Sequence, residues 1–334
     1  MLRKLWSRVK SLFTRIFRRV PVPGRFEADS RSALRGPLAS APWIWPSREY
    51  LVYVPRGHAR WRRVPLVVLI HGCRQKAEDI AEGTRITALA DELGCLVMLP
   101  RQNPKANAWG CWNWFDAATV RGWGETAIVA AQVRAVRRKY RIDRKRVFVA
   151  GMSAGGGLAA VLGVRRPELV AGVFIHSGVA CGAASSALAA LNVLKRGADT
   201  DVIGIAREAR ERAAPRALPV PLVAIQGADD DVVAPVNAVQ LIRQYLALNG
   251  HQAADAGARE ELPPPDHVNA ETLADARTII TSEWRVADHV VARHILVDGL
   301  GHAWSGGDDR HPYHDPRAPD ATALLGAFVR RAMQ

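Results

Sequence analysis

Cysteine is scarce in this sequence, and no two cysteines have the C-x-x-C spacing. The four cysteines are widely separated: Cys73, Cys95, Cys111 and Cys181. This spacing excludes the common zinc sites and the small scaffolds held by several disulfides, and it leaves room for one isolated bridge. With 334 residues, 49% of them hydrophobic, the chain can bury a large core as one big domain or two small ones.

Acidic residues are absent from the first nineteen positions, which hold seven of the 46 lysines and arginines. The rest of the chain therefore has an excess of only seven basic residues, although the formal net charge of the whole is +14. Such a small excess, without a recognisable nucleic-acid-binding motif, argues against DNA or RNA as a partner.

The first twenty residues also lack the uninterrupted apolar core of a conventional secretory signal. On a helical wheel their large apolar side chains fall in one arc of about 140°, and every arginine and lysine lies outside it. We expect a cationic amphipathic helix over residues 1–20. Its apolar face, within residues 2–19, suits an anionic membrane or a lipid-coated granule. Docking on its own domain and an arginine-rich transit peptide are the alternatives.

Residues 21–46 show little periodicity and contain "PVPG" and "RGPLASAPWIWP", which is typical of a linker or a wrapping arm. From residue 47 to 334, apolar strand patterns alternate with helical patterns. Strands are predicted at 48–55, 65–72, 95–100, 146–151, 170–175 and 221–227, and helices at 78–94, 124–140, 156–166 and 235–250. This alternation predicts an α/β domain with a mostly parallel sheet and helices on both faces, and its ligands are expected beyond the carboxyl ends of the strands.

One serine lies between two glycines where a predicted strand meets a helix, in "VFVAGMSAGGGLAAV". Gly151, Ser153 and Gly155 form the pattern G-x-S-x-G, which presents a nucleophilic serine on a tight strand-to-helix turn. Side chains two positions before and after the serine would collide with neighbouring backbone, and glycine removes this collision. The helix N-terminus beside Ser153 favours developing negative charge.

A nucleophilic serine needs a histidine base, and the histidine needs a carboxylate to hold its tautomer. The strand at 221–227 ends in three consecutive aspartates: Asp229, Asp230 and Asp231. Further on, "HILVDGLGH" ends an apolar strand at His302. The order serine, acid, histidine is that of doubly wound hydrolases, although the pattern alone does not separate the three aspartates.

The other histidines lack a matching partner, and we interpret them as structural: His176, His251, His267, His289 and His294. The stretch "DDRHPYHDP" contains residue types that bind metals, but it has no helical or strand spacing that would bring those side chains together at one site. No metal or cofactor is therefore expected.

Five motifs occur in the order seen in the polyhydroxybutyrate (PHB) depolymerase family of serine esterases: "IHGCRQ", "CWNWF", "AGMSAGGG", "GADDDVVAP" and "GHAWSGG". The sequence resembles this branch of the α/β-hydrolases, which is related to feruloyl and acetylxylan esterases, from about Arg48 to the C-terminus. The resemblance implies an α/β-hydrolase fold and hydrolysis of carboxylic esters, either of poly(3-hydroxybutyrate) or of related hydroxyalkanoate oligomers. Feruloylated or acetylated carbohydrates are alternative substrates. A granule- or membrane-surface protein without catalysis is the alternative of another class.

The resemblance implies that Ser153 is the nucleophile, His302 the general base and acid, and Asp230 the carboxylate. Asp230 is singled out because the family's G-x-x-D-x-x-V pattern maps onto Gly227, Asp230 and Val233.

The backbone amide of Ala154 is the expected first donor of the oxyanion hole, and Cys73 in "HGC" looks like the second. In similar proteins a cysteine in "CWNWF" accompanies the one in "HGC", so a bridge between Cys73 and Cys111 is our hypothesis. Two free buried thiols are the alternative for a cytosolic protein.

Trp112, Trp114 and Trp304 are the candidates for substrate binding, because an aromatic wall close to His302 suits an apolar ester chain. Core packing is the competing interpretation for each of them. Arg74 and Ser305 depart from the family pattern, which weakens the case for a crystalline polymer as substrate. The resemblance suggests an extracellular protein, whereas the N-terminal segment leaves a cytoplasmic or surface-associated location open. Oligomeric state is not readable from this sequence.

Overall fold

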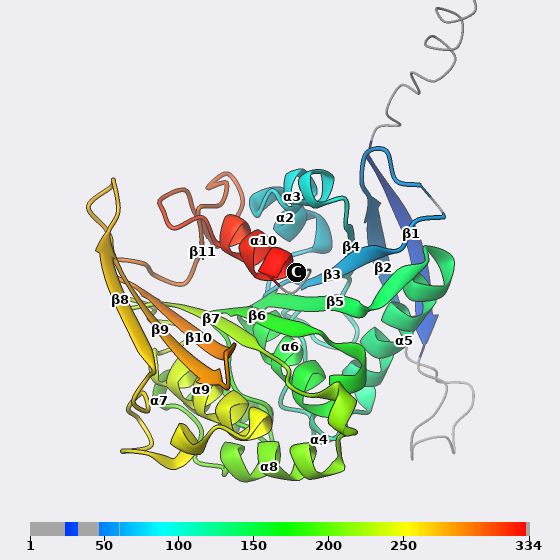
Figure 1. Ribbon diagram of the computed structural model, residues 1–334. Helices are drawn as coiled ribbons and strands as arrows, with labels where there is room; N and C mark the ends of the chain where they lie inside the picture. Colours follow the sequence, from blue (N-terminus) through cyan, green and yellow to red (C-terminus); the bar gives the residue numbers. More distant parts are fainter. Residues whose placement is uncertain (1–23, 33–46, 60, 332–334) are drawn as a thin grey trace, which may run out of the picture.

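A computed structural model describes residues 24–32, 47–59 and 61–331 (Figure 1). The large sheet contains strands β1 (Arg25–Ser32), β2 (Ser47–Val54), β3 (Val64–Ile70), β4 (Leu96–Pro100), β5 (Ile142–Met152), β6 (Gly172–His176), β7 (Leu222–Gly227), β8 (His267–Thr272), β9 (Thr278–Val286) and β10 (His289–Val297). A small separate sheet pairs β11 (Trp304–Ser305) with β12 (His314–Asp315).

The helices are α2 (Ala77–Gly83), α3 (Ile86–Leu93), α4 (Ala117–Val120), α5 (Gly124–Lys139), α6 (Ala154–Arg165), α7 (Ala187–Arg196), α8 (Val202–Arg212), α9 (Val236–Asn249) and α10 (Ala321–Arg331). Short 3-10 turns lie at η1 (Pro167–Leu169), η2 (Pro215–Ala217) and η3 (Gln252–Asp255). Among the residues that the structure describes, none of these helices has the length and hydrophobicity that crossing a bilayer requires.

The strand order across the large sheet is β1-β2-β4-β3-β5-β6-β7-β10-β9-β8. The central strands from β4 to β10 run parallel, and β1 and β2 at one edge and β8 and β9 at the other add antiparallel pairs. The mostly parallel sheet predicted from the sequence is confirmed. The hairpin of β8 and β9 was not predicted, because β8 is exposed along its whole length and neither strand has a continuous apolar run.

Two hydrophobic cores lie on opposite faces of the sheet, since successive side chains of a strand point to opposite sides. Along β3, Leu66 and Val68 pack in one core, and Val67 and Leu69 pack in the other. Helices α5, α6, α8 and α9 cover the first face, and α2, α3 and α10 cover the second (Figure 1). The helices predicted on both faces are therefore confirmed.

The single helix predicted over residues 78–94 is wrong, because the chain forms two helices, α2 and α3, with a break between them. Arg85 has a left-handed backbone with φ 55°, which a continuous right-handed helix does not allow. Thr84 closes α2 by donating its hydroxyl hydrogen to Ile80 O at 2.6 Å. Both features turn the chain and let α3 follow at a new angle.

Of the two interpretations of residues 21–46, a linker or a wrapping arm, the described part does not fit a plain linker, because Arg25–Ser32 form the edge strand β1, antiparallel to β2. Tyr50 Oη on β2 donates to Asp29 Oδ2 at 3.0 Å, and Lys139 Nζ lies 2.9 Å from Glu27 Oε2. Polar side chains thus hold a strand that has few apolar residues. The predicted helix at 1–20 lies outside the described residues.

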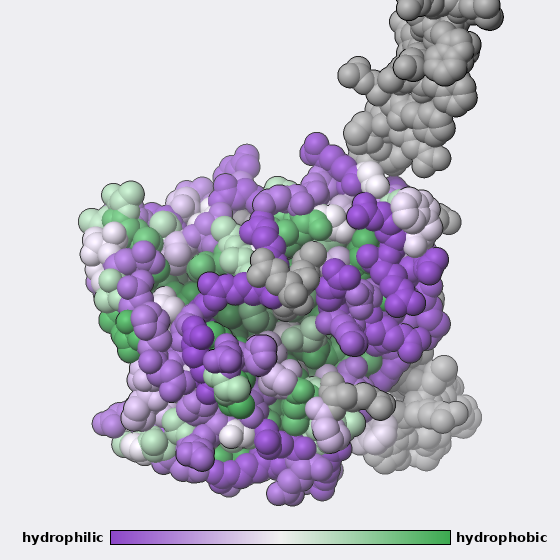
Figure 2. All heavy atoms as spheres, viewed as in Figure 1, coloured by the Kyte–Doolittle hydropathy of each residue, from purple (hydrophilic) through white to green (hydrophobic). Residues whose placement is uncertain are grey.

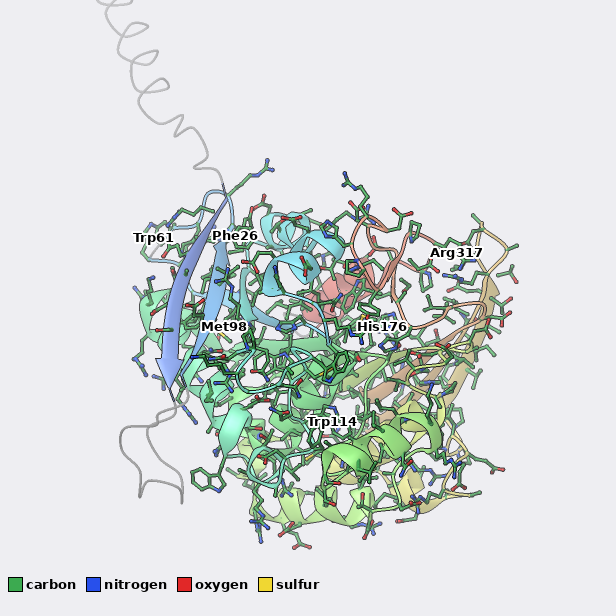
Figure 3. The ribbon with its side chains drawn as sticks, turned by 180° about the vertical axis from the view of Figure 1, so that it is seen from behind. Phe26, Trp61, Met98, Trp114, His176 and Arg317 are labelled. Atoms are coloured by element: carbon green, nitrogen blue, oxygen red, sulfur yellow. A yellow bond between two sulfur atoms is a disulfide. The ribbon has the colours of Figure 1, made fainter. Side chains whose placement is uncertain are left out.

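Hydrophilic side chains cover much of the face seen in Figure 2, as expected for the outer surface of a sheet covered by helices. From behind, Trp114 and His176 lie toward the middle of the molecule, whereas Phe26 and Trp61 lie near the edge formed by β1 (Figure 3).

The β1 contact predicts a stability effect that depends on pH. A hydrogen bond from Tyr140 lowers the pKa of Glu27 from 4.5 to about 2, and Lys139 contributes. Because the pKa is lower in the folded state, this stabilisation is complete above pH 4.5 and is lost as the pH falls toward 2. We expect Glu27→Gln to lower the free energy of unfolding by about 1 kcal/mol or less at pH 7, and by less at pH 3, as measured by urea unfolding.

Glu49→Gln is the matched control, since Glu49 on β2 pairs with Arg101, which follows β4, and this pair does not involve a β1 side chain. An identical loss for Glu27→Gln at pH 7 and pH 3 would contradict the role assigned to this carboxylate.

Candidate active site

Ser153 lies at the turn from β5 into α6, with φ 56° and ψ −125°. A backbone of this kind is sparsely populated by residues other than glycine, and it persists only where the surroundings enforce it. A Cβ atom on Gly155 would lie 2.2 Å from Ile70 O, and one on Gly151 would lie 2.4 Å from Gly155 O. The collision predicted from the sequence is confirmed, and it explains both glycines.

The loop after β3 lies directly against this turn. A Cβ atom on Gly72 would be 3.3 Å from Ser153 Cβ. The amide of Gly72 donates to Gln75 Oε1 at 2.9 Å, and the amide of Arg74 donates to Trp109 O at 2.9 Å. Cys73 lies between these two engaged amides and lines the same cavity as Ser153.

Asp230 follows β7, and its side chain is fully buried. It accepts hydrogen bonds from the backbone amides of Val232 at 3.0 Å and Val233 at 2.8 Å. Burial raises the pKa of this carboxyl, but the hydrogen bond and the charge of His302, with the amide of Val233, outweigh burial and lower the pKa. Asp229 and Asp231 are exposed. Burial therefore separates Asp230 from its two neighbours.

His302 follows β10 and is held by Asp230. Its Nδ1 lies 2.8 Å from Asp230 Oδ2 and 3.1 Å from Oδ1. The two loops meet because β7 and β10 are parallel neighbours whose carboxyl ends share one edge of the sheet. Nδ1 therefore donates to Asp230, which leaves the Nε2 of a neutral ring as the basic nitrogen. His302 and Ser153 line one cavity, so the structure brings the three predicted side chains together.

His176, at the end of β6, lies behind this group. It is fully buried, and burial lowers its pKa to about 3, with a contribution from His302. Its ring stacks on Trp304 with centroids 5.4 Å apart, and its Nε2 accepts from the amide of Ser305 at 3.4 Å. The interpretation of His176 as structural fits this packing.

The cavity beside Ser153 has a volume of about 530 Å³ and is mainly apolar. Its apolar lining comes from Trp109, Trp114, Phe115, Met152, Ala187, Ala190, Leu191, Leu194 and Val232, and Tyr313 lies beside His302. The α7 members are spaced i, i+3, i+4 and i+7, a helical apolar face that the sequence already displays. That spacing is the signal by which they could have been found.

Two of the three predicted substrate-binding tryptophans need correction. Trp114 lines the cavity, but Trp112 and Trp304 are fully buried and lie outside its lining. Trp304 donates its Nε1 hydrogen to Thr322 Oγ1 at 3.1 Å, so its polar edge points into the protein. Trp112 packs with its ring 5.5 Å from that of His71. Proximity to His302 in the sequence was a poor guide, because the chain turns inward after His302.

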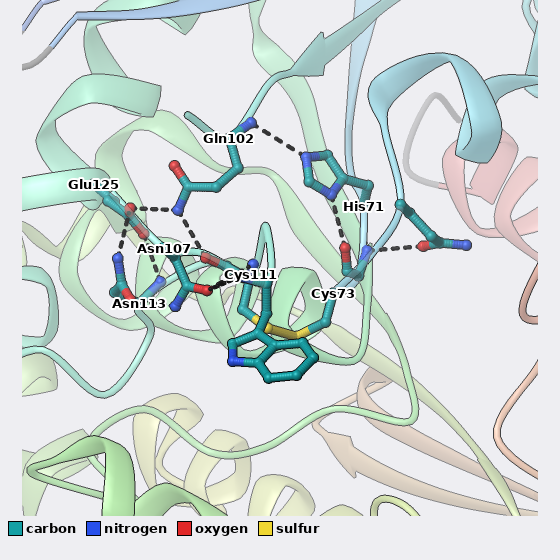
Figure 4. Close-up of a disulfide and its surroundings, with 10 residues drawn as sticks. His71, Cys73, Gln102, Asn107, Cys111, Asn113 and Glu125 are labelled. Atoms are coloured by element: carbon teal, nitrogen blue, oxygen red, sulfur yellow. Dashed lines mark hydrogen bonds between the residues drawn. A yellow bond between two sulfur atoms is a disulfide. The ribbon is translucent and has the colours of Figure 1, made fainter. Parts of the chain in front are cut away.

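The predicted bridge between Cys73 and Cys111 is confirmed (Figure 4). It ties the loop after β3 to a segment 38 residues further along the chain. Cys95 and Cys181 are free and buried. The alternative, in which Cys73 and Cys111 are free buried thiols, is therefore wrong.

Within the described part of the chain, no group of three or more His, Cys, Asp or Glu side chains is arranged to hold a metal ion. In the stretch considered from the sequence, Asp308 pairs with Arg310 and His311 Nε2 lies 3.4 Å from Glu82.

Residues 48–264 match the model of a protein family described as Esterase PHB depolymerase. The chain is 30% identical over 200 residues to poly(3-hydroxyalkanoate) depolymerase C of Paucimonas lemoignei, a match that covers 59% of this chain and 48% of that protein. It is 27% identical over 198 residues to poly(3-hydroxybutyrate) depolymerase of Ralstonia pickettii, a match that covers 53% of this chain and 39% of that protein. The matches thus span less than half of each of these two relatives.

Among solved structures, the chain is similar to the acetyl xylan esterase from Aspergillus awamori, with a TM-score of 0.63 and 21% identity. That similarity covers 83% of this chain and 94% of the other. At this identity the likeness shows the fold alone, and it confirms the predicted α/β-hydrolase fold.

The burial of Asp230 predicts which of the three aspartates matters for the expected ester hydrolysis. Asp230→Asn is expected to lower kcat for p-nitrophenyl butyrate by about 10²- to 10⁴-fold, because the histidine loses the group that holds its tautomer. Asp229→Asn and Asp231→Asn are matched controls at the exposed neighbours, and each is expected to stay within about twofold of the unaltered protein. Equal losses in all three variants would remove the basis for choosing Asp230.

The bridge predicts a thiol count and a stability loss. Thiol titration of the denatured, unreduced protein is expected to detect the two sulfhydryls of Cys95 and Cys181. The double variant Cys73→Ser/Cys111→Ser is expected to lower the free energy of unfolding by about 2–4 kcal/mol. In the control variant Cys95→Ala/Cys181→Ala, thiols should appear only after reduction. Four titratable sulfhydryls in the unreduced protein would exclude the bridge.

Proposed function

The chain belongs to the esterase PHB depolymerase family, and from this premise we propose that it hydrolyses carboxylic esters through an acyl-enzyme on Ser153. One observation carries the proposal. A buried Asp230 holds His302 by Nδ1 at 2.8 Å, beside a cavity that His302 shares with Ser153 on its strained turn. These are the groups that nucleophilic acyl transfer needs.

In the proposed reaction, Ser153 Oγ attacks the ester carbonyl carbon while His302 Nε2 accepts the hydroxyl proton. The oxygen of the tetrahedral intermediate accepts hydrogen bonds from the amides of Cys73 and Ala154. The imidazolium then gives its proton to the leaving alkoxide, and the alcohol departs. A water molecule then loses a proton to His302 and attacks the acyl carbon. The bond between the acyl carbon and Ser153 Oγ breaks as His302 returns that proton to Oγ, which releases the acid and the free serine.

The low pKa of Asp230 supports its role. The carboxylate stays ionised at neutral pH and stabilises the imidazolium that forms when His302 takes the serine proton. The α6 N-terminus, where Ala154 is the first residue, supports the oxyanion site through its free amide and dipole.

An ester with an aliphatic acyl chain suits the cavity. Trp114, Phe115, Leu191 and Leu194 offer apolar surface next to Ser153. We therefore propose poly(3-hydroxybutyrate) or related hydroxyalkanoate oligomers as substrates. Acetylated or feruloylated carbohydrate is the second candidate substrate. It is included in the substrate test because the chain is similar in fold to an acetyl xylan esterase.

Large apolar side chains are exposed around the mouth of this cavity, and they support access to a polyester surface. Trp109 is 62% exposed and Leu191 is 63% exposed, and both line the cavity. Leu188, one turn earlier on α7, is 74% exposed. We propose that the predicted helix within residues 2–19 adds attachment to a granule or membrane surface.

We also propose residues 47–334 as the catalytic domain, with β1 added to its edge. The bridge between Cys73 and Cys111 suits an oxidising compartment, which supports the extracellular location suggested by the family.

The proposal predicts that Ser153→Ala abolishes ester hydrolysis. With p-nitrophenyl butyrate, kcat is expected to fall by at least about 10³-fold, because no other group forms the acyl-enzyme. Thermal unfolding of the variant serves as the control for folding. Equal rates in the variant and the unaltered protein would contradict the esterase proposal. They would favour the alternative, a surface protein without catalytic activity.

The unaltered protein and Ser153→Ala also serve to distinguish the substrate classes. Release of 3-hydroxybutyrate from suspended polymer and from soluble oligomers is compared with release of acetate from acetylxylan and of ferulate from methyl ferulate. Activity confined to the carbohydrate esters and ferulate would replace the polyester assignment.

A further inference from the structure

The cavity beside Ser153 carries an unbalanced positive charge. Among the residues that the structure describes, its lining contains no aspartate or glutamate, and Arg74 is its only arginine or lysine. The exposed Arg74 side chain forms no ion pair and no hydrogen bond with any of the described residues. Arg74 departs from the family pattern, and the proposed reaction gives it no role. This cation is therefore available to a ligand that enters the cavity.

Two neutral polar side chains of the lining are, in contrast, already engaged within the protein. Gln75 Oε1 accepts from the amide of Gly72 at 2.9 Å, and Gln75 Nε2 donates to Pro312 O at 3.0 Å. Asn107 Oδ1 accepts from the amide of Trp109 at 3.0 Å, and Asn107 Nδ2 donates to a neighbouring asparagine at 2.9 Å. These side-chain amides offer little to a ligand, whereas the N–H groups of the guanidinium have no partner among the described residues.

Backbone contacts and one ring fix the direction of the Arg74 side chain. The backbone of Arg74 has φ 59°, a left-handed conformation that is uncommon for a residue with a side chain. Its amide donates to Trp109 O at 2.9 Å, and the disulfide from Cys73 to Cys111 joins the same two segments (Figure 4). The guanidinium carbon lies 4.6 Å from the centroid of the Trp109 ring, which is a cation–π contact. The guanidinium is thus held at the cavity without a salt bridge.

The free donors of this guanidinium determine the kind of ligand that fits. An indole ring attracts the charge of the cation without accepting a conventional hydrogen bond. The planar fork of N–H groups then suits a carboxylate, which accepts two parallel hydrogen bonds. Because the rest of the lining is mainly apolar, the matching ligand is an aliphatic ester that also carries a carboxylate.

We propose that Arg74 is a specificity-determining residue that binds the free carboxylate of a short hydroxyalkanoate oligomer while an ester bond of that oligomer lies at Ser153. The inference rests on the proposed function, because it takes ester hydrolysis at Ser153 as given. Arg74 directly follows Cys73, whose amide is the proposed oxyanion donor. Its side chain therefore leaves the backbone one residue from the place where the reacting carbonyl binds.

The chemistry of the oligomer determines which ester bonds benefit from this contact. In a hydroxyalkanoate chain the free carboxylate lies on the alcohol side of every ester bond, so it departs with the alcohol when Ser153 is acylated. Only the ester bond nearest to the carboxyl end has the carboxylate close to its carbonyl. A long polymer has a single such end, and its interior esters have no carboxylate nearby. Arg74 therefore favours soluble dimers and trimers over the interior of a polymer chain.

The dimer of 3-hydroxybutyrate and its primary carboxamide test the inference, because they share the same ester bond and differ in charge. We expect the unaltered protein to hydrolyse the carboxylate dimer with a kcat/KM about tenfold higher than that for the carboxamide, which is the effect of about one charge-assisted hydrogen bond. In Arg74→Gln this ratio is expected to fall to about one. Chromatography of the remaining dimer measures both rates.

Two further variants and one control separate the fork from the charge. Arg74→Gly suits the left-handed backbone, so it keeps the fold and should also lose the preference. Arg74→Lys retains the charge without the planar fork, and it should keep a preference of about threefold. Lys76→Gln removes an exposed charge from the same loop, outside the cavity lining, and should keep the ratio of the unaltered protein. Thermal unfolding is measured for every variant.

Salt supplies a readout that a purely structural role would not move. Raising sodium chloride from about 0.05 M to about 0.5 M screens an exposed ion pair. In the unaltered protein, kcat/KM for the carboxylate dimer should therefore fall by at least about twofold relative to that for the carboxamide. In Arg74→Gln the same change of salt should leave the ratio of the two substrates constant.

A ratio near one in the unaltered protein would overturn the inference, and so would a ratio that Arg74→Gln and Arg74→Gly leave unchanged. Hydrolysis of p-nitrophenyl butyrate without hydrolysis of either dimer would overturn it as well. A failure of the proposed function would give a different result, because Ser153→Ala would then hydrolyse p-nitrophenyl butyrate at the rate of the unaltered protein.

Discussion

The close packing of two backbone segments around Ser153 is the constraint on which the site depends. The turn from β5 into α6 presses Gly155 against the carbonyl oxygens at the end of β3, with only 2.2 Å for a Cβ next to Ile70 O. The same strand end continues into His71 and Gly72, and Gly72 lies against Ser153. The nucleophile and the proposed oxyanion loop are thus positioned against each other by direct backbone packing. Neither could move by the width of a methyl group without displacing the other.

The charged half of the site is built on a second pair of strands. The loops after β7 and β10 carry Asp230 and His302, and they meet because these strands are parallel neighbours. Gly227 makes this meeting possible, since a Cβ there would lie 2.1 Å from Leu300 O. The carboxylate is buried with its hydrogen-bond acceptors filled by two amides and the imidazole, which offsets the cost of burying its charge.

Patterns that depend on local periodicity were predicted well. The parallel strands, the helices on both faces and the turn at Ser153 follow from apolar runs, helical spacing and paired glycines. Long-range predictions were weaker where burial decides the outcome. Trp112 and Trp304 resemble Trp114 in the sequence, but they pack in the interior beside His71 and His176. The cavity instead takes its apolar wall from α7, whose face was visible as a spacing but could not be assigned to the site before the fold was known.

The sequence by itself determined the fold class, the order of serine, acid and histidine, and the glycines that allow the turn, because each is expressed in neighbouring residues. The residues by themselves did not separate Asp229, Asp230 and Asp231. The resemblance singled out Asp230, and only the tertiary structure showed the physical reason, which is that Asp230 alone of the three is buried. It also decided that β1 joins the sheet and that the loops after β7 and β10 meet. These contacts join residues distant in the chain, or depend on which atoms of a side chain find a buried partner. Local sequence patterns do not indicate either kind of contact.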